Sequence, residues 1–222
     1  MGEAGLLDNR RLIAVRESII EWFDGNGRKF PWRNTKNPFH ILVAEMLLRR
    51  TTASAVARIY DDFLSRFSNP MSLKRARLST IERMVSTLGL QSVRAKHLHE
   101  TASILVRDYE GQVPQDVAVL ESLPGVGRYA AAAIANFAFE CPEAMVDGNV
   151  LHLMNRVFSL EIDLPTEERI WKFMTLFGGA KQDSRLYWGI IDIVALTCLR
   201  KNPRCQTCPL LLNCSYPTAN PK

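Results

Sequence analysis

The sequence predicts an all-α fold, and three observations support this expectation. Apolar residues return every three or four positions along most of the chain, which is the spacing of an α-helix with one buried face. No stretch alternates apolar and polar residues as a half-buried strand does. Hydrophobic residues make up 47% of the 222 positions, enough to bury the core of one large domain or of two smaller ones.

The expected helices follow from these patterns in chain order. The first spans about 9–23, with Asp8 as its N-cap and the sequence DGNG (24–27) as its end. Further helices are expected at about 39–50, 54–67, 79–88, 94–108, 117–122, 128–139, 150–158, 167–177 and 186–197. Ser79 and Glu82 have the spacing of a capping box and predict the start of the helix at 79–88.

Charge and hydropathy narrow the class of protein. Lys and Arg number 28 against 23 Asp and Glu, and the net charge of +5 weakly favours a polyanionic partner. No apolar run is long enough to cross a membrane, and the N-terminus has no apolar signal core. We therefore expect a cytoplasmic protein, associated with the nucleoid if the source is prokaryotic.

The segment LPGVGRYAAAAIANFAF (123–139) begins with two glycines that a helix built for packing would avoid, since each costs about 1 kcal/mol against alanine. A turn through Gly125, Val126 and Gly127 leaves backbone N–H groups uncovered at the start of the next helix. These donors and the helix dipole form an anion site, to which Arg128 adds a positive charge. The pattern favours a helix-hairpin-helix that holds a DNA backbone over an ordinary tight corner between two helices.

Four of the five cysteines lie close together in CLRKNPRCQTCPLLLNC. They are Cys198, Cys205, Cys208 and Cys214, with six, two and five residues between them. An intracellular chain is not expected to hold them as disulfides, so a metal centre is the better interpretation. Structural zinc usually has two Cys-x₂-Cys pairs and this chain has one, whereas four cysteines also suit a [4Fe–4S] cluster. Three basic residues between the first two cysteines are expected to contact phosphates: Arg200, Lys201 and Arg204.

The hairpin and the cysteine spacing together resemble the helix-hairpin-helix superfamily of DNA glycosylases, which includes endonuclease III, from about Lys29 to Cys214. The resemblance implies a two-lobed helix-hairpin-helix glycosylase fold with a C-terminal iron–sulfur cluster loop. One lobe is a helical barrel domain with the hairpin (28–139), and the other is the helical cluster domain (1–27 plus 140–222). It also implies a [4Fe–4S] cluster on the four cysteines, and a monomer that binds double-stranded DNA containing a mismatched or damaged base.

The sequence MVDGNV places Asp147 about twenty positions past the hairpin, where the family has its catalytic aspartate. Breaking an N-glycosidic bond builds positive charge on the sugar, and a carboxylate at the anomeric carbon stabilises that charge and activates water. The alternative is an ordinary helix N-cap, a position that Asp favours. The resemblance implies that Asp147 meets Glu45 between the two lobes.

The segment FPWRNTKNPFHILVAEMLLRRTT (30–52) resembles that of adenine glycosylases and of mismatch thymine/uracil glycosylases. In adenine glycosylases the residue matching Glu45 protonates the leaving base, which needs a raised pKa; for thymine or uracil it would orient the base or water. Trp32 matches an aromatic residue near the base pocket, with core packing as an equal alternative. Arg49, Arg50 and Thr51 fall where the family fills the gap left by a flipped base.

Departures from the related branches point toward thymine or uracil. Bifunctional members carry a Schiff-base lysine where this chain has Tyr129, which cannot form an imine, so we expect no strand cleavage. Gln91 and Ser92 replace tyrosines of the adenine branch, and Trp188 replaces its adenine-contacting Gln. His152 favours neither branch, because both usually have a basic residue there, and a phosphate or base contact is expected to be weaker. The chain ends eight residues after its last cysteine, so we expect no C-terminal domain of the adenine type.

The leading interpretation is a monofunctional base-excision-repair glycosylase that removes thymine or uracil mispaired with guanine. A short adenine glycosylase acting on A:G or A:8-oxoguanine pairs is the first alternative. A non-catalytic DNA-binding module and a zinc-stapled helical protein without a DNA role are the others. The presence of both carboxylates, Asp147 and Glu45, favours an enzyme.

Overall fold

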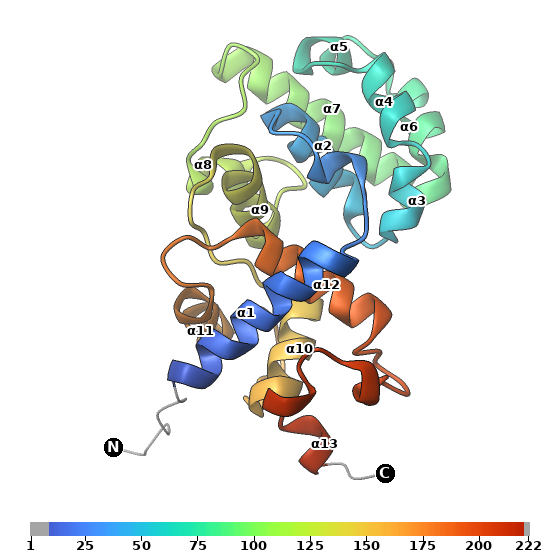
Figure 1. The fold of residues 1–222 in the computed structure, drawn as a ribbon. Coiled ribbons are helices and arrows are strands. Elements are labelled where there is room, and N and C mark those ends of the chain that lie inside the picture. Colours follow the sequence, from blue (N-terminus) through green and yellow to red (C-terminus); the bar gives the residue numbers. More distant parts are fainter. Residues whose placement is uncertain (1–8, 220–222) are drawn as a thin grey trace. The chain divides into compact units, whose positions relative to one another are not determined.

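The computed structural model describes residues 9–219, and the chain divides into two compact units (Figure 1). Unit 1 comprises Met1–Arg28 and Pro142–Lys222, and unit 2 comprises Lys29–Cys141. Every regular element within 9–219 is helical, which confirms the predicted all-α class. None of these helices is both long enough and apolar enough to span a bilayer. Asp8, the expected first N-cap, lies outside the described residues.

Unit 2 is built on two tightly packed helices, α2 (Pro38–Leu48) and α9 (Arg128–Phe139). Its elements are η1 (Pro31–Arg33), α2 (Pro38–Leu48), α3 (Ala53–Ala57), α4 (Tyr60–Arg66), α5 (Pro70–Lys74), α6 (Leu78–Val85), η2 (Ser86–Leu88), α7 (Gln91–Asp108), α8 (Val117–Ser122) and α9 (Arg128–Phe139). Helix α9 packs against α2 and α8, while α7 runs along α5 and α6 (Figure 1). The alanines of α9, residues 130–133, are all buried, and their small side chains let the helix axes approach closely.

Two local predictions in unit 2 are wrong. The helix expected at 54–67 is two helices, α3 and α4, because the chain tightens into a turn in which the N–H of Ile59 bonds to the carbonyl of Val56. Ser79 and Glu82 form no capping box, since α6 begins at Leu78 without a side-chain cap. A capping box does occur in unit 2, between Asn69 and Ser72 at the unpredicted helix α5.

Unit 1 packs the N-terminal helix against C-terminal ones. Its elements are α1 (Asn9–Asn26), α10 (Gly148–Phe158), α11 (Glu168–Gly178), α12 (Ser184–Leu196), η3 (Cys205–Thr207), η4 (Leu211–Asn213) and α13 (Tyr216–Ala219). Helix α1 lies along α12 (Figure 1), where a Cβ added to Gly189 would stand 2.6 Å from Cγ2 of Ile19. Helix α1 also continues to Asn26, beyond the end predicted from DGNG.

A buried ion pair holds the end of the α1 segment onto α12. Asp192 is completely buried, and its carboxylate accepts hydrogen bonds from the backbone N–H of Arg28 at 2.7 Å and from Nε of Arg28 at 2.8 Å. The Nη2 atom of Arg28 lies 2.7 Å from the same carboxylate. The buried charge of Asp192 is therefore compensated by several donors, as a group withdrawn from water requires.

Candidate functional site

Asp147 is the N-cap of α10. Its Oδ1 atom accepts the backbone N–H groups of Asn149 and Val150, both at 2.8 Å. Its Oδ2 atom accepts the side-chain amide of Asn149 at 2.9 Å. The capping geometry that formed the alternative interpretation of Asp147 is therefore present, and the remaining question is whether capping accounts for its environment.

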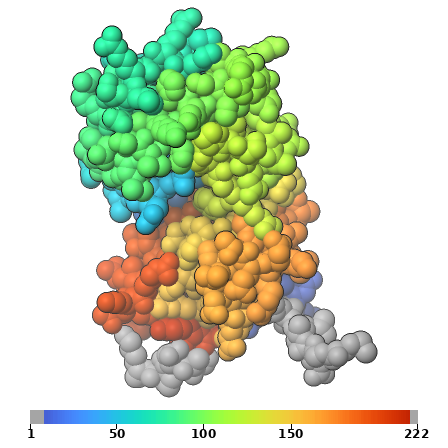
Figure 2. Space-filling view, turned by 180° about the vertical axis from the view of Figure 1, so that it is seen from behind, coloured from blue at the N-terminus to red at the C-terminus, as the bar shows by residue number. Residues whose placement is uncertain are grey.

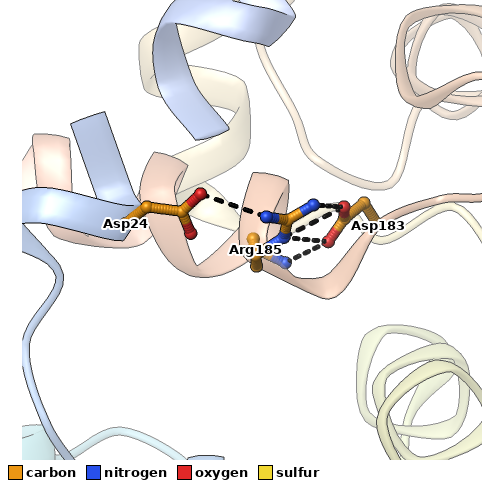
Figure 3. Close-up of polar contacts among 3 residues, drawn as sticks. All are labelled: Asp24, Asp183 and Arg185. Atoms are coloured by element: carbon orange, nitrogen blue, oxygen red, sulfur yellow. Dashed lines mark hydrogen bonds and ion pairs between the residues drawn. The ribbon is translucent and has the colours of Figure 1, made fainter. Parts of the chain in front are cut away.

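Asp183, the N-cap of α12, shows what a purely structural cap looks like in the same unit (Figure 3). It accepts the backbone N–H of Arg185 at 2.8 Å and forms an ion pair with Nη2 of Arg185 at 2.7 Å. Arg185 also reaches Oδ2 of Asp24 at 3.0 Å. The charge of Asp183 is thus neutralised by an arginine two residues along the chain.

The two caps differ in the direction of their pKa shifts. Burial raises the pKa of Asp147, and the hydrogen bonds from Val150 and Asn149 together with the charge of Arg200 oppose this rise without cancelling it. Burial acts in the same direction on Asp183, but the hydrogen bonds and charge of Arg185 outweigh it and hold the pKa of Asp183 below its usual value. A carboxyl with a raised pKa that is kept at a helix N-terminus is typical of a functional site.

Arg200 connects the cysteine-rich tail to the N-terminus of α10. Its Nη2 atom donates to the carbonyl of Gly148 at 3.1 Å, and its charge acts on the carboxylate of Asp147. The sequence predicted a phosphate contact for Arg200 and gave no signal of this contact, because the two segments are 52 residues apart. Lys201 and Arg204, the other basic residues of the loop, are exposed.

A surface hollow follows α10 beside this contact. It is lined by Gly148, His152 and Asn155 on the helix and by Arg200 from the tail, with the segment 161–163 on its other side. In the space-filling view, α10 is visible between the α11 region and the tail (Figure 2). Gly148, the first residue of α10, is exposed and lines this hollow, so the N-terminus of the helix is reached from the surface of unit 1.

Glu45 lies in α2 of unit 2 and is buried, with 7% of its surface exposed. The neighbouring Tyr60 donates to the carbonyl of His40 at 2.9 Å. Burial raises the pKa of Tyr60, and the negative charges of Asp61 and Glu45 raise it further. The expectation that Glu45 is not a solvent-facing glutamate is confirmed.

Trp32 belongs to a buried aromatic group in unit 2. Its ring stacks on Phe30 with centroids 4.8 Å apart and meets Tyr60 edge-on at 5.3 Å. The packing alternative for Trp32 is therefore present in the structure. A contact of Trp32 with a flipped base stays a prediction.

The hairpin between α8 and α9 requires a glycine in its turn and leaves the start of α9 open. Gly125 has φ +83°, and a Cβ there would lie 2.9 Å from His97, so only glycine fits. A Cβ on Gly127 would meet nothing within 4 Å, and no side chain caps α9 at this end. Thr101 fixes the turn by donating to the carbonyl of Pro124 at 2.9 Å. The turn is thus anchored on one side, where Val126 is buried, and open on the other, where Gly127 and Arg128 are exposed.

Arg49 and Arg50, both predicted to fill a gap in DNA, differ in the structure. Arg49 donates to the carbonyl of Gly125 at 3.0 Å and so braces the hairpin. Arg50 is exposed and has φ +54°, while Thr51 follows it in a turn closed by a bond from its N–H to the carbonyl of Leu48. Arg50 is therefore the better placed of the two arginines to reach outward.

Sequence reasoning missed two apolar side chains on the same surface. Leu90 and Val93 are each 53% exposed, and they share a pocket with Arg49 and Arg50. Leu90 has φ +52° and directly precedes Gln91 and Ser92, which open α7 and are exposed. Their contact with DNA stays a prediction. The signal available in the sequence was a leucine that directly follows a glycine just before a helix.

The remaining predicted side chains are placed as follows. Tyr129 is half-buried in the first turn of α9. Trp188 is half-buried in α12, with its ring 5.9 Å from that of Phe23. The Nε2 atom of His152 lies 3.0 Å from the carbonyl oxygen of Cys198, so His152 contacts the cysteine-rich tail.

The four cysteines of the tail line one pocket, together with apolar side chains such as Leu153 and Val157. All of them are free thiols. Arg156 donates to Sγ of Cys198 at 3.5 Å and to the carbonyl of Leu199 at 2.8 Å. Arg11 donates to the carbonyl of Asn213 at 2.8 Å, on the other side of the tail. The donor set is thus gathered and held in place by arginines.

Across the described chain, no three His, Cys, Asp or Glu side chains converge closely enough to hold a single metal ion.

The predicted site residues fall into both units. Asp147, His152, Trp188 and the tail lie in unit 1, and Glu45 lies in unit 2 with the hairpin and the Arg50 surface. Each half is defined by itself. The meeting of Asp147 with Glu45 stays a prediction.

An anchored, open hairpin in one unit and a four-cysteine tail in the other define a helical protein of the helix-hairpin-helix class. The family model described as "HhH-GPD superfamily base excision DNA repair protein" matches residues 43–176. The chain belongs to the HhH-GPD superfamily of base excision DNA repair proteins.

Proteins similar to this chain include thymine-, thymine/uracil- and adenine DNA glycosylases. The chain is 36% identical to the thymine-DNA glycosylase of Aeropyrum pernix, over 95% of this chain and 97% of that protein. It is 35% identical to the thymine/uracil-DNA glycosylase of Methanothermobacter thermautotrophicus, over 94% and 95%. An adenine DNA glycosylase of Buchnera aphidicola is 33% identical, but this chain covers only 58% of it. The solved structure of a thermostable thymine-DNA glycosylase matches with a TM-score of 0.91 at 32% identity, over 96% of this chain and 99% of that one.

The contrast between the two aspartate caps predicts opposite effects of the same substitution. Asn caps helices as well as Asp does, so Asp147→Asn and Asp183→Asn both keep the cap and remove only the charge. Because the folded pKa of Asp147 is raised, the stability that its neutral form contributes is present below the unfolded pKa and lost as pH rises. Asp147→Asn should therefore increase the free energy of unfolding at pH 8, with a gain that shrinks toward pH 3.

For Asp183 the sign is reversed, because its folded pKa is lowered and its carboxylate stabilises the fold above the unfolded pKa. Asp183→Asn should decrease the free energy of unfolding at pH 8, and the deficit should shrink as the pH falls. Urea unfolding of both variants and the wild type at pH 8 and near pH 3.5 measures this. Shifts of the same sign in the two variants would contradict the assignment.

Proposed function

We propose that this protein is a DNA glycosylase that releases thymine or uracil mispaired with guanine from duplex DNA, by hydrolysis and without cutting the strand. The observation that carries the proposal is the identity of about one third to thymine- and thymine/uracil-DNA glycosylases over nearly the whole length of both chains. The raised pKa of Asp147, whose neighbour Gly148 lines a surface hollow, supports a chemical role for that residue.

The hydrogen bonds of Asp147 indicate which of its oxygens acts. Oδ1 accepts two backbone N–H groups, whereas Oδ2 accepts only the side-chain amide of Asn149. Oδ2 is therefore the oxygen that faces the anomeric carbon, stabilises the positive sugar and directs the attacking water. Fixing the carboxylate to the helix backbone means that it need not reorganise as the charge develops.

In this mechanism Glu45 contacts the flipped base. Its burial in α2, beside Tyr60, would shelter its carboxyl from water. For thymine or uracil the base is held and oriented, and the bond breaks without protonation of a purine nitrogen. Tyr129 near the hairpin offers no amine, so water is the nucleophile and an abasic site remains.

The DNA would be held by groups from both units. The N–H groups at Gly127 and Arg128 would bind a phosphate, as would Lys201 and Arg204. Arg50 would enter the space vacated by the base, and the exposed Leu90 would act as an apolar wedge between base pairs. Arg49, which is bonded to the hairpin, serves to hold the turn.

The cysteine pocket has the ligands that a [4Fe–4S] cluster needs. Four cysteines share this pocket and would hold the cluster: Cys198, Cys205, Cys208 and Cys214. Structural zinc usually has two Cys-x₂-Cys pairs, and this chain has one. When bound, the cluster would fix the shape of the loop that carries Arg200 and Lys201.

The proposal is tested by base release from duplexes that carry T:G, U:G, A:G and A opposite 8-oxoguanine, each with and without alkali. We expect release from T:G or U:G with strand cleavage only after alkali. Asp147→Asn should slow release by about 10²- to 10³-fold or more, because one electrostatic stabiliser is lost, while the affinity for DNA persists. Release of adenine alone would replace the proposal by the adenine alternative, and no release from any duplex would overturn it.

The acid side of the pH profile should depend on Arg200. Burial raises the pKa of Asp147 and the charge of Arg200 lowers it, so Arg200→Met should move the loss of activity at low pH to a higher pH. Single-turnover rates at saturating enzyme between pH 4.5 and 9 measure the shift. Lys201→Met is the matched control and should weaken DNA binding without moving the profile. A uniform, salt-dependent loss of affinity in Arg200→Met with an unmoved profile would show that Arg200 only contacts phosphate.

Cluster binding has a spectroscopic signature. Protein purified without oxygen should be yellow-brown, with broad absorbance near roughly 400 nm and about four irons per chain. Cys214→Ser should reduce both iron content and absorbance, whereas Cys141→Ser should leave them unchanged because Cys141 belongs to unit 2. A colourless protein containing one zinc would contradict the cluster.

A further inference from the structure

Arg94 is a buried arginine of unit 2 that bonds the chain directly before Arg50 and directly before Leu90. Arg94 lies in the first turn of α7 and is 6% exposed. Its Nη1 atom donates to the carbonyls of Met46 at 2.8 Å and of Leu47 at 3.0 Å. Its Nη2 atom donates to the carbonyls of Arg49 at 3.0 Å and of Gly89 at 3.4 Å.

No salt bridge to Arg94 occurs among the described residues, so main-chain carbonyls compensate its charge. Three of these carbonyls lie at and just beyond the C-terminal end of α2, where the helix leaves its last carbonyls unbonded and where the dipole is negative. The Nε atom is buried without a partner, although a buried N–H is costly to leave unbonded. The position of the guanidinium is therefore set by the carbonyls that it bonds.

The bonded carbonyls belong to two segments that both have unusual backbone conformations. Directly after the Arg49 carbonyl, Arg50 has φ +54°, and directly after the Gly89 carbonyl, Leu90 has φ +52°. Non-glycine residues with such angles persist only where the surrounding structure imposes them. Arg94 is one group that bonds both segments, and Leu90 and Arg50 line one pocket with it.

We propose that Arg94 is a positioning residue that joins the Arg49–Thr51 turn and the Gly89–Leu90 turn into one preformed wedge, so that Arg50 and Leu90 enter the duplex together. This inference rests on the proposed function, since it assigns Arg94 to the base-flipping step. A wedge ordered in the free protein loses little conformational freedom on binding, which favours extrusion of the base. Lysine cannot replace Arg94, because one ammonium group does not span carbonyls from two segments as the planar fork does.

The first experiment compares Arg94→Lys with the wild type. A tetrahydrofuran abasic duplex with 2-aminopurine beside the gap reports unstacking by the wedge as a rise in fluorescence and needs no catalysis. We expect a smaller rise for Arg94→Lys, and a fall of about 10- to 100-fold in single-turnover base release from the G mismatch. Arg107→Met, an exposed arginine at the other end of α7, is the matched control and should behave as wild type.

A double-mutant cycle separates positioning from a general structural role. If Arg94 acts through the wedge, Arg94→Lys should cost little further in an Arg50→Ala/Leu90→Ala background, because the groups that it positions are gone. An additive loss in that background, or wild-type fluorescence from folded Arg94→Lys, would overturn the proposal.

If Arg94→Lys is too unstable to assay, hydrogen exchange at low temperature can still measure the protection of the backbone amides of residues 48–52 and 88–91. Loss of protection confined to these two segments supports the proposal, and loss spread evenly over unit 2 overturns it. If the wild type releases no base from any duplex, the proposed function fails, while the abasic-duplex fluorescence and the exchange still decide the role of Arg94.

Discussion

The withdrawal of charge from water is the constraint on which both units depend. A buried charge must be compensated by hydrogen bonds or by an opposite charge, and helix ends supply main-chain groups that nothing else uses. In unit 1 the completely buried Asp192 is compensated by Arg28, and Asp147 by the N–H groups that open α10. In unit 2 the carbonyls that close α2 compensate Arg94. Asp147 and Arg94 thus each fix a helix end, and the proposed functional groups lie at or beside those two ends.

Asp147 and Asp183 show how a small difference in sequence separates a structural cap from a candidate catalytic one. Both residues open a buried helix of unit 1, and each has a donor two positions further on. For Asp183 that donor is the charged Arg185, whereas for Asp147 it is the neutral amide of Asn149. The arginine neutralises its aspartate locally, while the amide orients the carboxylate and leaves its charge available. A carboxylate whose charge is left available can stabilise a cation that forms during a reaction.

Local patterns in the sequence were sufficient for most of the helices and for the tight turn at Gly125. The requirement for a glycine at Gly125 is set by the turn itself, where φ is positive and a Cβ would lie 2.9 Å from His97. The split between α3 and α4 and the misplaced capping box show the limit, since several Ser, Thr and Asn residues compete for each helix start. The roles of Arg94 and Arg200 could not be predicted from local patterns. Arg94 bonds the carbonyl of Arg49, 45 residues away, and Arg200 bonds the carbonyl of Gly148, 52 residues away.

The contact of Arg200 with α10 gives the cysteine-rich tail an electrostatic role at Asp147, in addition to its proposed role in DNA binding. Arg156 fixes the tail by donating to the carbonyls of Leu199 and Arg200, and Arg200 in turn bonds the carbonyl next to Asp147. The shape of the tail therefore sets the distance between a positive charge and the carboxylate of Asp147. A cofactor that holds the four cysteines in one arrangement would also hold this distance constant. A cluster bound there would support catalysis through electrostatics, without itself taking part in bond cleavage.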